Sequence, residues 1–230
     1  MSTQTPSRPD PARRTSTLQK RQSMLPKPSS IVLDPSVLIA QHAQLTGTHP
    51  ITIGPNAILH PHCKVSSAFA PVVLGEGVLI YERARAGVGF GDTGGGSGSG
   101  DESRRSSVAS SGGARDSLRV DGTVLGKNVV VESAAVVEAA EVGEGSVIEA
   151  QAVLGRGCVV GKFCTIGASC VLPPNTSIPD YTVVYGGGER RIDKTLQSRP
   201  EILQARVLMH TRQIDMFKKL VPNNVAKWST

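Results

Sequence analysis

Apolar residues recur along most of this chain at an interval of six positions. We call these recurring apolar residues anchors. The interval begins at Leu33, is interrupted after Ala86 and resumes at Leu125. Nineteen of the twenty anchors are Leu, Ile or Val, a regularity that chance does not produce in a chain that is 39% hydrophobic. The anchors are Leu33, Ile39, Leu45, Ile53, Leu59, Val65, Leu74, Ile80, Ala86, Leu125, Val131, Val137, Val142, Ile148, Leu154, Val160, Ile166, Leu172, Ile178 and Val184.

A second set of positions agrees with this frame. Except before the breaks in the interval, the residue four places after an anchor is small or β-branched, as at Ala57, Val129 and Ala152. The residue directly after an anchor is often Gly, as at Gly143, which suits a corner where a side chain would obstruct or where a positive φ is needed. This is a hexapeptide repeat, in which three strand-and-corner units close one triangular coil. We therefore predict an all-β fold, a parallel β-helix of about six to seven coils.

Four breaks in the interval set the predicted domain organisation. Two corners gain residues, one loses a residue, and the largest break is a Gly/Ser-rich stretch without apolar periodicity. We expect that stretch to loop out as a disordered insertion. The predicted segments are a disordered basic tail (1–29), the first part of the β-helix (30–88), the insertion (89–122), the second part of the β-helix (123–188) and a C-terminal helical segment (189–230).

The insertion contains a run of two arginines and two serines that resembles a site for a basophilic kinase. Ser107 is the candidate phosphorylation site in that run.

The pattern becomes helical after Pro200. Apolar side chains alternate at intervals of four and three until Pro222, which predicts a C-terminal α-helix of about 20 residues with one broad apolar stripe. We expect this stripe to pack on the flank or open end of the chain's own β-helix, and a shared interface with a partner is the alternative. The candidate packing residues are Leu203, Val207, Ile214, Phe217 and Val221.

Composition and charge narrow the function classes. The chain has four Phe, three Tyr and one Trp, too few rings for a platform on which single-stranded nucleic acid stacks. The net charge of +6 comes from the ends, because residues 1–30 and 189–230 each carry +5 while the repeats are neutral to acidic. We therefore expect no nucleic-acid partner. No apolar run is long enough for a transmembrane segment or a secretory signal, so the four Cys are expected to be reduced thiols of a cytosolic protein.

The cysteines and histidines are the residues that could carry chemistry. Cys158, Cys164 and Cys170 occupy the small inward position of the repeat on three different faces, which favours packing over metal binding. The histidines cluster early in the chain, and residues 63–209 contain none, which disfavours a three-His zinc site. We predict no catalytic, cofactor-binding or metal-binding residue. His60 and His62 remain the candidate bases if the protein is an acyltransferase.

Four stretches of the chain are similar to the dynactin subunit 6 family of β-helix proteins. These stretches read ITIGPNAILHPHCKV, PVVLGEGVLIYERA, VLGKNVVVESAAVVEAAEVGEGSVIEAQAVLGRGCVVGKFCTIGASCVLPPN and IPDYTVVYGGGERR. The shortened interval between Val137 and Val142 fits the same family. The resemblance covers about residues 31–86 and 124–221, and it implies that the β-helix is left-handed.

The resemblance also implies a function. It suggests a non-catalytic structural subunit without cofactors, located in the cytoplasm on the microtubule-associated cytoskeleton. Its partners would be dynactin subunit 5 and the pointed-end actin-related protein, and indirectly dynein and its cargo. Two alternatives stay open, because hexapeptide-repeat acyltransferases and a class of carbonic anhydrases share this architecture.

Overall fold

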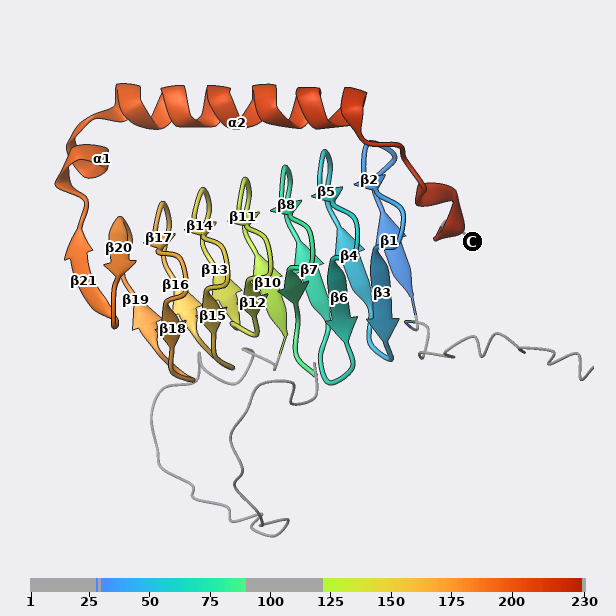
Figure 1. Cartoon of the computed structure of the whole chain (residues 1–230), viewed down its shortest axis with the longest axis horizontal. Coiled ribbons are helices and arrows are strands. Elements are labelled where there is room, and N and C mark those ends of the chain that lie inside the picture. Colours follow the sequence, from blue (N-terminus) through green and yellow to red (C-terminus); the bar gives the residue numbers. More distant parts are fainter. Residues whose placement is uncertain (1–27, 29, 90–121, 229–230) are drawn as a thin grey trace, which may run out of the picture.

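The computed structural model describes residues 28, 30–89 and 122–228. Within them the chain winds into a left-handed parallel β-helix of about six coils, followed by a long helix (Figure 1). The predicted fold class is therefore confirmed. Ser107, most of the predicted N-terminal tail and most of the predicted insertion lie outside the described residues.

Three sheets form the faces of the prism, and each coil adds one strand to each sheet. Sheet A consists of β1 (Ile31–Leu33), β4 (Ile51–Ile53), β7 (Val72–Leu74), β10 (Thr123–Leu125), β13 (Glu141–Val142), β16 (Val159–Val160) and β19 (Ser177–Ile178). Sheet B consists of β2 (Leu38–Ile39), β5 (Ile58–Leu59), β8 (Leu79–Ile80), β11 (Val130–Val131), β14 (Val147–Ile148), β17 (Thr165–Ile166), β20 (Thr182–Tyr185) and β21 (Glu189–Ile192). Sheet C consists of β3 (Gln44–Gly47), β6 (Lys64–Ser67), β9 (Arg85–Ala86), β12 (Val136–Val137), β15 (Val153–Leu154) and β18 (Val171–Leu172).

The register stacks equivalent anchors on one another. In sheet A, Leu33 pairs with Ile53, Ile53 with Leu74, and Leu74 with Leu125, so β7 and β10 stay in register across the insertion between them. The anchors from Ile39 to Val184 are almost fully buried and form one continuous core along the prism. A core this narrow is filled by stacked aliphatic side chains, which explains the scarcity of aromatic residues.

All four breaks in the sequence interval fall at the same edge of the prism, where the chain passes from sheet C to sheet A. The breaks lie between β3 and β4, between β6 and β7, between β9 and β10, and between β12 and β13. The other two edges keep a uniform turn from coil to coil. Changes in length at one edge leave the strand register intact, because each sheet pairs only through its own strands.

Close contact between coils explains the glycines that follow the anchors. A Cβ atom on Gly143 would lie 2.5 Å from the carbonyl carbon of Gly161 in the next coil. The backbone of Gly143 has no positive φ, unlike that of Gly145 two residues later. The close spacing of these coils therefore requires the absence of a side chain at Gly143, and conformational freedom is not the reason.

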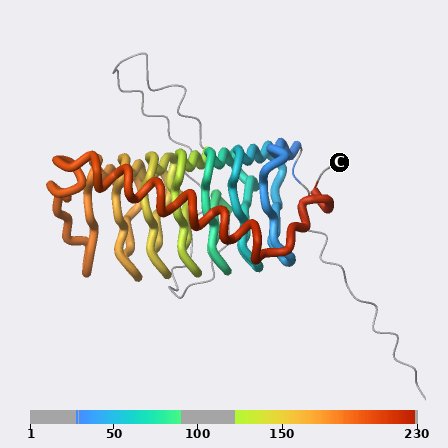
Figure 2. The backbone as a smooth tube through the Cα atoms, turned by 90° about the horizontal axis from the view of Figure 1, so that it is seen from above, coloured from blue at the N-terminus to red at the C-terminus, as the bar shows by residue number. Residues whose placement is uncertain are grey.

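The C-terminal segment turns back over the β-helix. Strand β21 pairs antiparallel with β20, and α1 (Lys194–Ser198) begins at Asp193, whose carboxylate accepts hydrogen bonds from the backbone of Thr195 and Leu196. Helix α2 (Pro200–Leu220) then runs the length of the prism back to the first coil (Figure 2). No helix among the described residues has the length and apolar character needed to cross a bilayer.

The chain end after α2 closes the N-terminal end of the prism. The side-chain oxygen of Asn223 accepts a hydrogen bond from the backbone of Ile39, and its amide donates to the carbonyl of Val37. The backbone N–H of Asn224 donates to the carbonyl of Ile39. The short 3-10 helix η1 (Val225–Lys227) follows, and Trp228 packs against the core. This segment therefore satisfies the outer edge of β2, which has no neighbouring strand on that side.

Candidate functional site

Helix α2 covers the outer face of sheet B, and the candidate site lies between them. Outward-pointing Leu38, Ile58 and Leu79 form a buried cluster with Ile214, and Phe217 and Val221 pack against its edge. This contact is tight over the first three coils. Burial of one such aliphatic side chain contributes roughly 1.5–3 kcal/mol, so the cluster holds this half of α2 on the prism.

A histidine and two aromatic rings close the interface beside this cluster. The ring of His60 stacks on Tyr81 at 4.7 Å between centroids, and Phe217 of α2 meets His60 edge-on at 4.6 Å. The Nε2 atom of His60 is buried without a hydrogen-bond partner. Burial lowers the pKa of His60 below its ordinary value, and the nearby Glu82 carboxylate opposes that shift. Tyr81 and Phe217 therefore cover part of the half-buried His60 ring.

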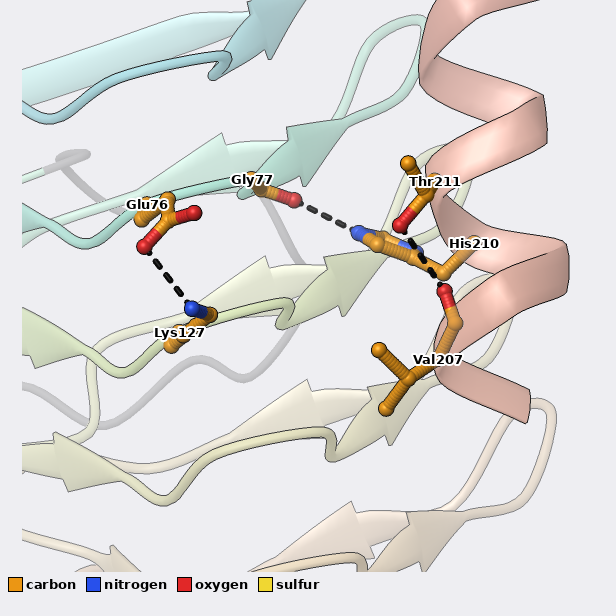
Figure 3. A network of polar contacts seen from close by, with 6 residues as sticks. All are labelled: Glu76, Gly77, Lys127, Val207, His210 and Thr211. Atoms are coloured by element: carbon orange, nitrogen blue, oxygen red, sulfur yellow. Dashed lines mark hydrogen bonds and ion pairs between the residues drawn. The ribbon is translucent and has the colours of Figure 1, made fainter. Parts of the chain in front are cut away.

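His210 lies further along α2 and is also buried. Its Nε2 atom is 2.7 Å from the backbone carbonyl of Gly77 (Figure 3). A carbonyl oxygen can only accept, so Nε2 carries the hydrogen and Nδ1 of the neutral ring keeps its lone pair. Burial lowers the pKa of His210, the hydrogen bond to Gly77 raises it, and the positive charge of Arg206 lowers it further. His210 is therefore a neutral imidazole near pH 7.

A groove opens where α2 passes over the middle coils of sheet B. Its volume is about 560 Å³, and Val130 and Val147 form its floor. The side chains from α2 that line it are Arg206, Met209, His210, Arg212, Gln213 and Met216. The amide of Gln213 donates a hydrogen bond to the hydroxyl of Tyr81, which fixes one end of the groove. The groove thus combines an apolar lining, two arginines and a neutral histidine.

The helix residues that the sequence singled out have different environments. Ile214 is buried, Phe217, Val221 and Leu203 are half-buried, and Val207 is 38% exposed. The apolar stripe of α2 is therefore in close contact with the prism only toward its C-terminal end. Over Val130 and Val147, the polar side chains beside the stripe, Arg206 and Gln213 among them, face the groove.

The other histidines and the cysteines lie away from this groove. His42 and His62 stack with their ring centroids 4.9 Å apart at the edge between sheets B and C. The four cysteines are free and buried, and burial raises the pKa of Cys63 to about 12. Within the described part of the chain, no three His, Cys, Asp or Glu side chains lie close enough to bind a metal ion.

Sequence reasoning missed Arg206 and Gln213, which are central to the groove. Each precedes a residue of the apolar stripe by one position, Val207 and Ile214 respectively, so both lie on the flank of the helix. A helical wheel identifies such flank positions. It does not show that a groove lies between these flank positions and the sheet.

Comparisons with known proteins support the fold. No protein-family model matches this chain, and no curated protein matches it. Among solved structures, a hexapeptide transferase family protein from Anaplasma phagocytophilum is similar, with a TM-score of 0.53, 12% identity, and coverage of 85% of this chain and 95% of that one. A putative acetyltransferase from Bacillus cereus has a TM-score of 0.48 and 13% identity, covering 83% of this chain and 92% of that one. A hexapeptide-repeat acetyltransferase from Vibrio cholerae, complexed with acetyl coenzyme A, has a TM-score of 0.34 and 16% identity, covering 72% of this chain and 67% of that one.

These matches correct one prediction made from the sequence. The prediction that the protein is not an enzyme is contradicted by this comparison, because the Anaplasma protein that shares its fold is named a hexapeptide transferase family protein. At 12% identity the likeness to the Anaplasma protein shows the fold that the two chains share. None of the three structures is a dynactin subunit, so the resemblance to that family stays a prediction.

Proposed function

We propose that the protein is a hexapeptide-repeat acyltransferase that moves an acyl group from a coenzyme A thioester to an amine or hydroxyl group. The observation that carries this proposal is His210, a neutral imidazole held by Gly77 at the wall of a groove that is mostly apolar. The transferase names of the matching structures support the same reaction class. An apolar groove of this size fits the thioester arm of such a donor.

The reaction needs one proton acceptor, and Nδ1 of His210 supplies it. As the acceptor nitrogen or oxygen attacks the thioester carbonyl, Nδ1 takes its proton. The carbon–sulfur bond then breaks, and the departing thiolate receives the proton back from the imidazolium. The products are the acylated acceptor and free coenzyme A, and His210 returns to the neutral form. Throughout, the Gly77 carbonyl holds the hydrogen on Nε2 and orients the ring.

The test is thioester cleavage by the full chain. Purified protein is incubated with acetyl coenzyme A and a panel of primary amines and sugars, and free coenzyme A is measured by chromatography. Loss of a general base typically slows a reaction by about 10²–10⁴-fold, so His210→Gln should reduce the rate by at least a hundredfold while its amide still donates to Gly77. His42→Gln changes an exposed histidine outside the groove and serves as the matched control.

Two results would overturn this assignment. One is a protein that neither binds nor cleaves acyl coenzyme A with any acceptor tested. The other is full activity in His210→Gln together with loss of saturable coenzyme A binding in the double variant His60→Ala, His62→Ala. That second result would move the site to the early coils.

A second proposal concerns assembly, and the outer face of sheet A favours it. Val32, Val73 and Val124 point outward from this face and are 57%, 38% and 42% exposed. Thr52 lies between Val32 and Val73 in the same register. We propose that this flat face packs on a sister β-helix in the cytoplasm, as the resemblance to the dynactin subunit 6 family suggests.

A pull-down from the protein's own cytosol tests the assembly. The expected companions are dynactin subunit 5 and the pointed-end actin-related protein, and Val73→Glu should release them because it buries a charge in the contact. Phe69→Ser, which changes an exposed ring beyond the end of the sheet A strands, is the control. Absence of both companions from the wild-type sample would refute this proposal and leave the acyltransferase proposal unaffected.

A further inference from the structure

Arg206 is a half-buried cation that forms no ion pair with any described residue. It lines the groove beneath α2, over Val130 and Val147. Within the described part of the chain its guanidinium makes no hydrogen bond and no ion pair. Burial lowers the pKa of Arg206, and the negative charge of the Asp193 carboxylate opposes this shift. A guanidinium offers five N–H donors, and none of them bonds to a described residue.

Such an arrangement costs stability unless something compensates it. Removing a charge from water without a partner is unfavourable, and buried arginines are normally paired with a carboxylate or phosphate. The two ion pairs among the described residues, Glu76 with Lys127 and Glu82 with Arg83, do not involve α2. Arg212 adds a second positive charge at the same groove. The groove therefore holds two positive side chains that no described anionic side chain pairs with, and an anionic ligand would compensate them.

Most of the other residues that line the groove are apolar, which indicates the chemistry of the rest of the ligand. Met209 and Met216 lie along one side and are 62% and 58% exposed, and Val130 and Val147 form the floor. Methionine side chains adapt to flexible apolar ligands. The volume of about 560 Å³ falls in the range of small-molecule sites and is too small for a protein helix.

We propose that this groove binds a small amphipathic anion, an unbranched alkyl chain that ends in a carboxylate or phosphate. The head group accepts paired hydrogen bonds from Arg206, with Arg212 adding long-range attraction. The chain lies between the two methionines and the two valines. This inference goes beyond acyl transfer, because such a ligand can be a substrate, a product or a regulator, and its binding does not require catalysis.

The experiment uses the full chain and isothermal titration calorimetry, with decanoate as the probe and decanol as its uncharged counterpart. Decanoate should bind saturably with one molecule per chain, and decanol should bind at least tenfold more weakly because it leaves Arg206 unpaired. Arg206→Met should weaken decanoate at least tenfold and bring the two probes to similar affinity. Arg199→Met removes an exposed arginine just before α2 and should change neither affinity.

The Arg206→Met variant should remain folded, so a change in its ligand binding can be attributed to the lost charge. Replacing an uncompensated half-buried charge by an apolar side chain of similar length should leave the thermal unfolding midpoint unchanged or raise it. The proposal is overturned if decanoate does not bind, if decanol binds as well as decanoate, or if Arg206→Met keeps the wild-type preference. The assay contains no thioester, so its outcome is separate from the test of acyl transfer.

Discussion

The hydrogen bonds of Asn223 allow a direct test of how the end of the prism is closed. Asn223→Ala removes the acceptor for the Ile39 N–H at 3.2 Å, the donor to the Val37 carbonyl at 3.2 Å and the acceptor for the Val225 N–H at 3.0 Å. Ile39 and Val37 are almost fully buried, and β2 has no strand on this side to replace the lost partners. The substitution therefore exposes the edge of the first coil.

The magnitude follows from these bonds. Each contributes about 0.5–1.5 kcal/mol net, and a buried group left without a partner costs about 1–3 kcal/mol. Asn223 itself is exposed, so water can reach part of the gap. We expect the variant to destabilise the cap by about 2 kcal/mol. With a urea m-value of about 2 kcal/mol/M, this lowers the midpoint of cap unfolding by about 1 M.

Trp228 provides the assay, because it is the single tryptophan of the chain and packs against the core beside the cap. Its fluorescence reports release of the cap, and far-UV circular dichroism reports the whole β-helix. Coils at the end of a repeat array can open without the rest, so the fluorescence transition should move to lower urea than the circular dichroism transition. Asn224→Ala is the matched control, since Asn224 bonds to Ile39 through its backbone.

Two outcomes would contradict this reasoning. If Asn223→Ala unfolds at the same urea concentration as the wild type, the side-chain bonds contribute nothing to the cap. If Asn224→Ala is destabilised equally, the effect arises from the segment in general and not from the amide of Asn223. Asn223→Asp keeps the acceptor and loses the donor, so its midpoint should lie between those of the wild type and Asn223→Ala.

Three further predictions concern the helix interface, the stacking of coils and the thiols. Burial lowers the pKa of His60 below its ordinary value of 6.5, so the folded state binds fewer protons there than the unfolded state. Urea melts followed by Trp228 fluorescence should therefore show a stability that is complete above pH 7 and declines as the pH falls through 6.5. His60→Phe should flatten this decline. Gly143→Ala should destabilise the fold by about 1–3 kcal/mol, the typical cost of overpacking a core, and lower the thermal midpoint. Gly187→Ala, with open space around its Cβ, should leave the midpoint unchanged. A thiol reagent should label none of the four buried cysteines in the native protein within minutes and all four in urea, and rapid labelling of Cys63 without denaturant would show that the core opens.

The histidines illustrate where residue patterns stop being informative. His60 and His62 are close in sequence and both were candidate bases, yet the structure encloses one between rings and stacks the other on His42 at a surface edge. His210 was visible only as one position in a helical stripe. The role proposed for it depends on the carbonyl of Gly77, which lies 133 residues away in the chain.

The sequence by itself determined the β-helix, its strands and the presence of the C-terminal helix. Every hexapeptide places the same kinds of residue at the same corner and face, so the local pattern is repeated often enough to specify the coil. Only the tertiary structure decided that α2 lies on sheet B, that its continuation caps the first coil and that Arg206 lines a groove. The physical reason is that these contacts join segments far apart in the chain, and their geometry depends on how β21 and α1 redirect the backbone, which no periodicity within α2 records.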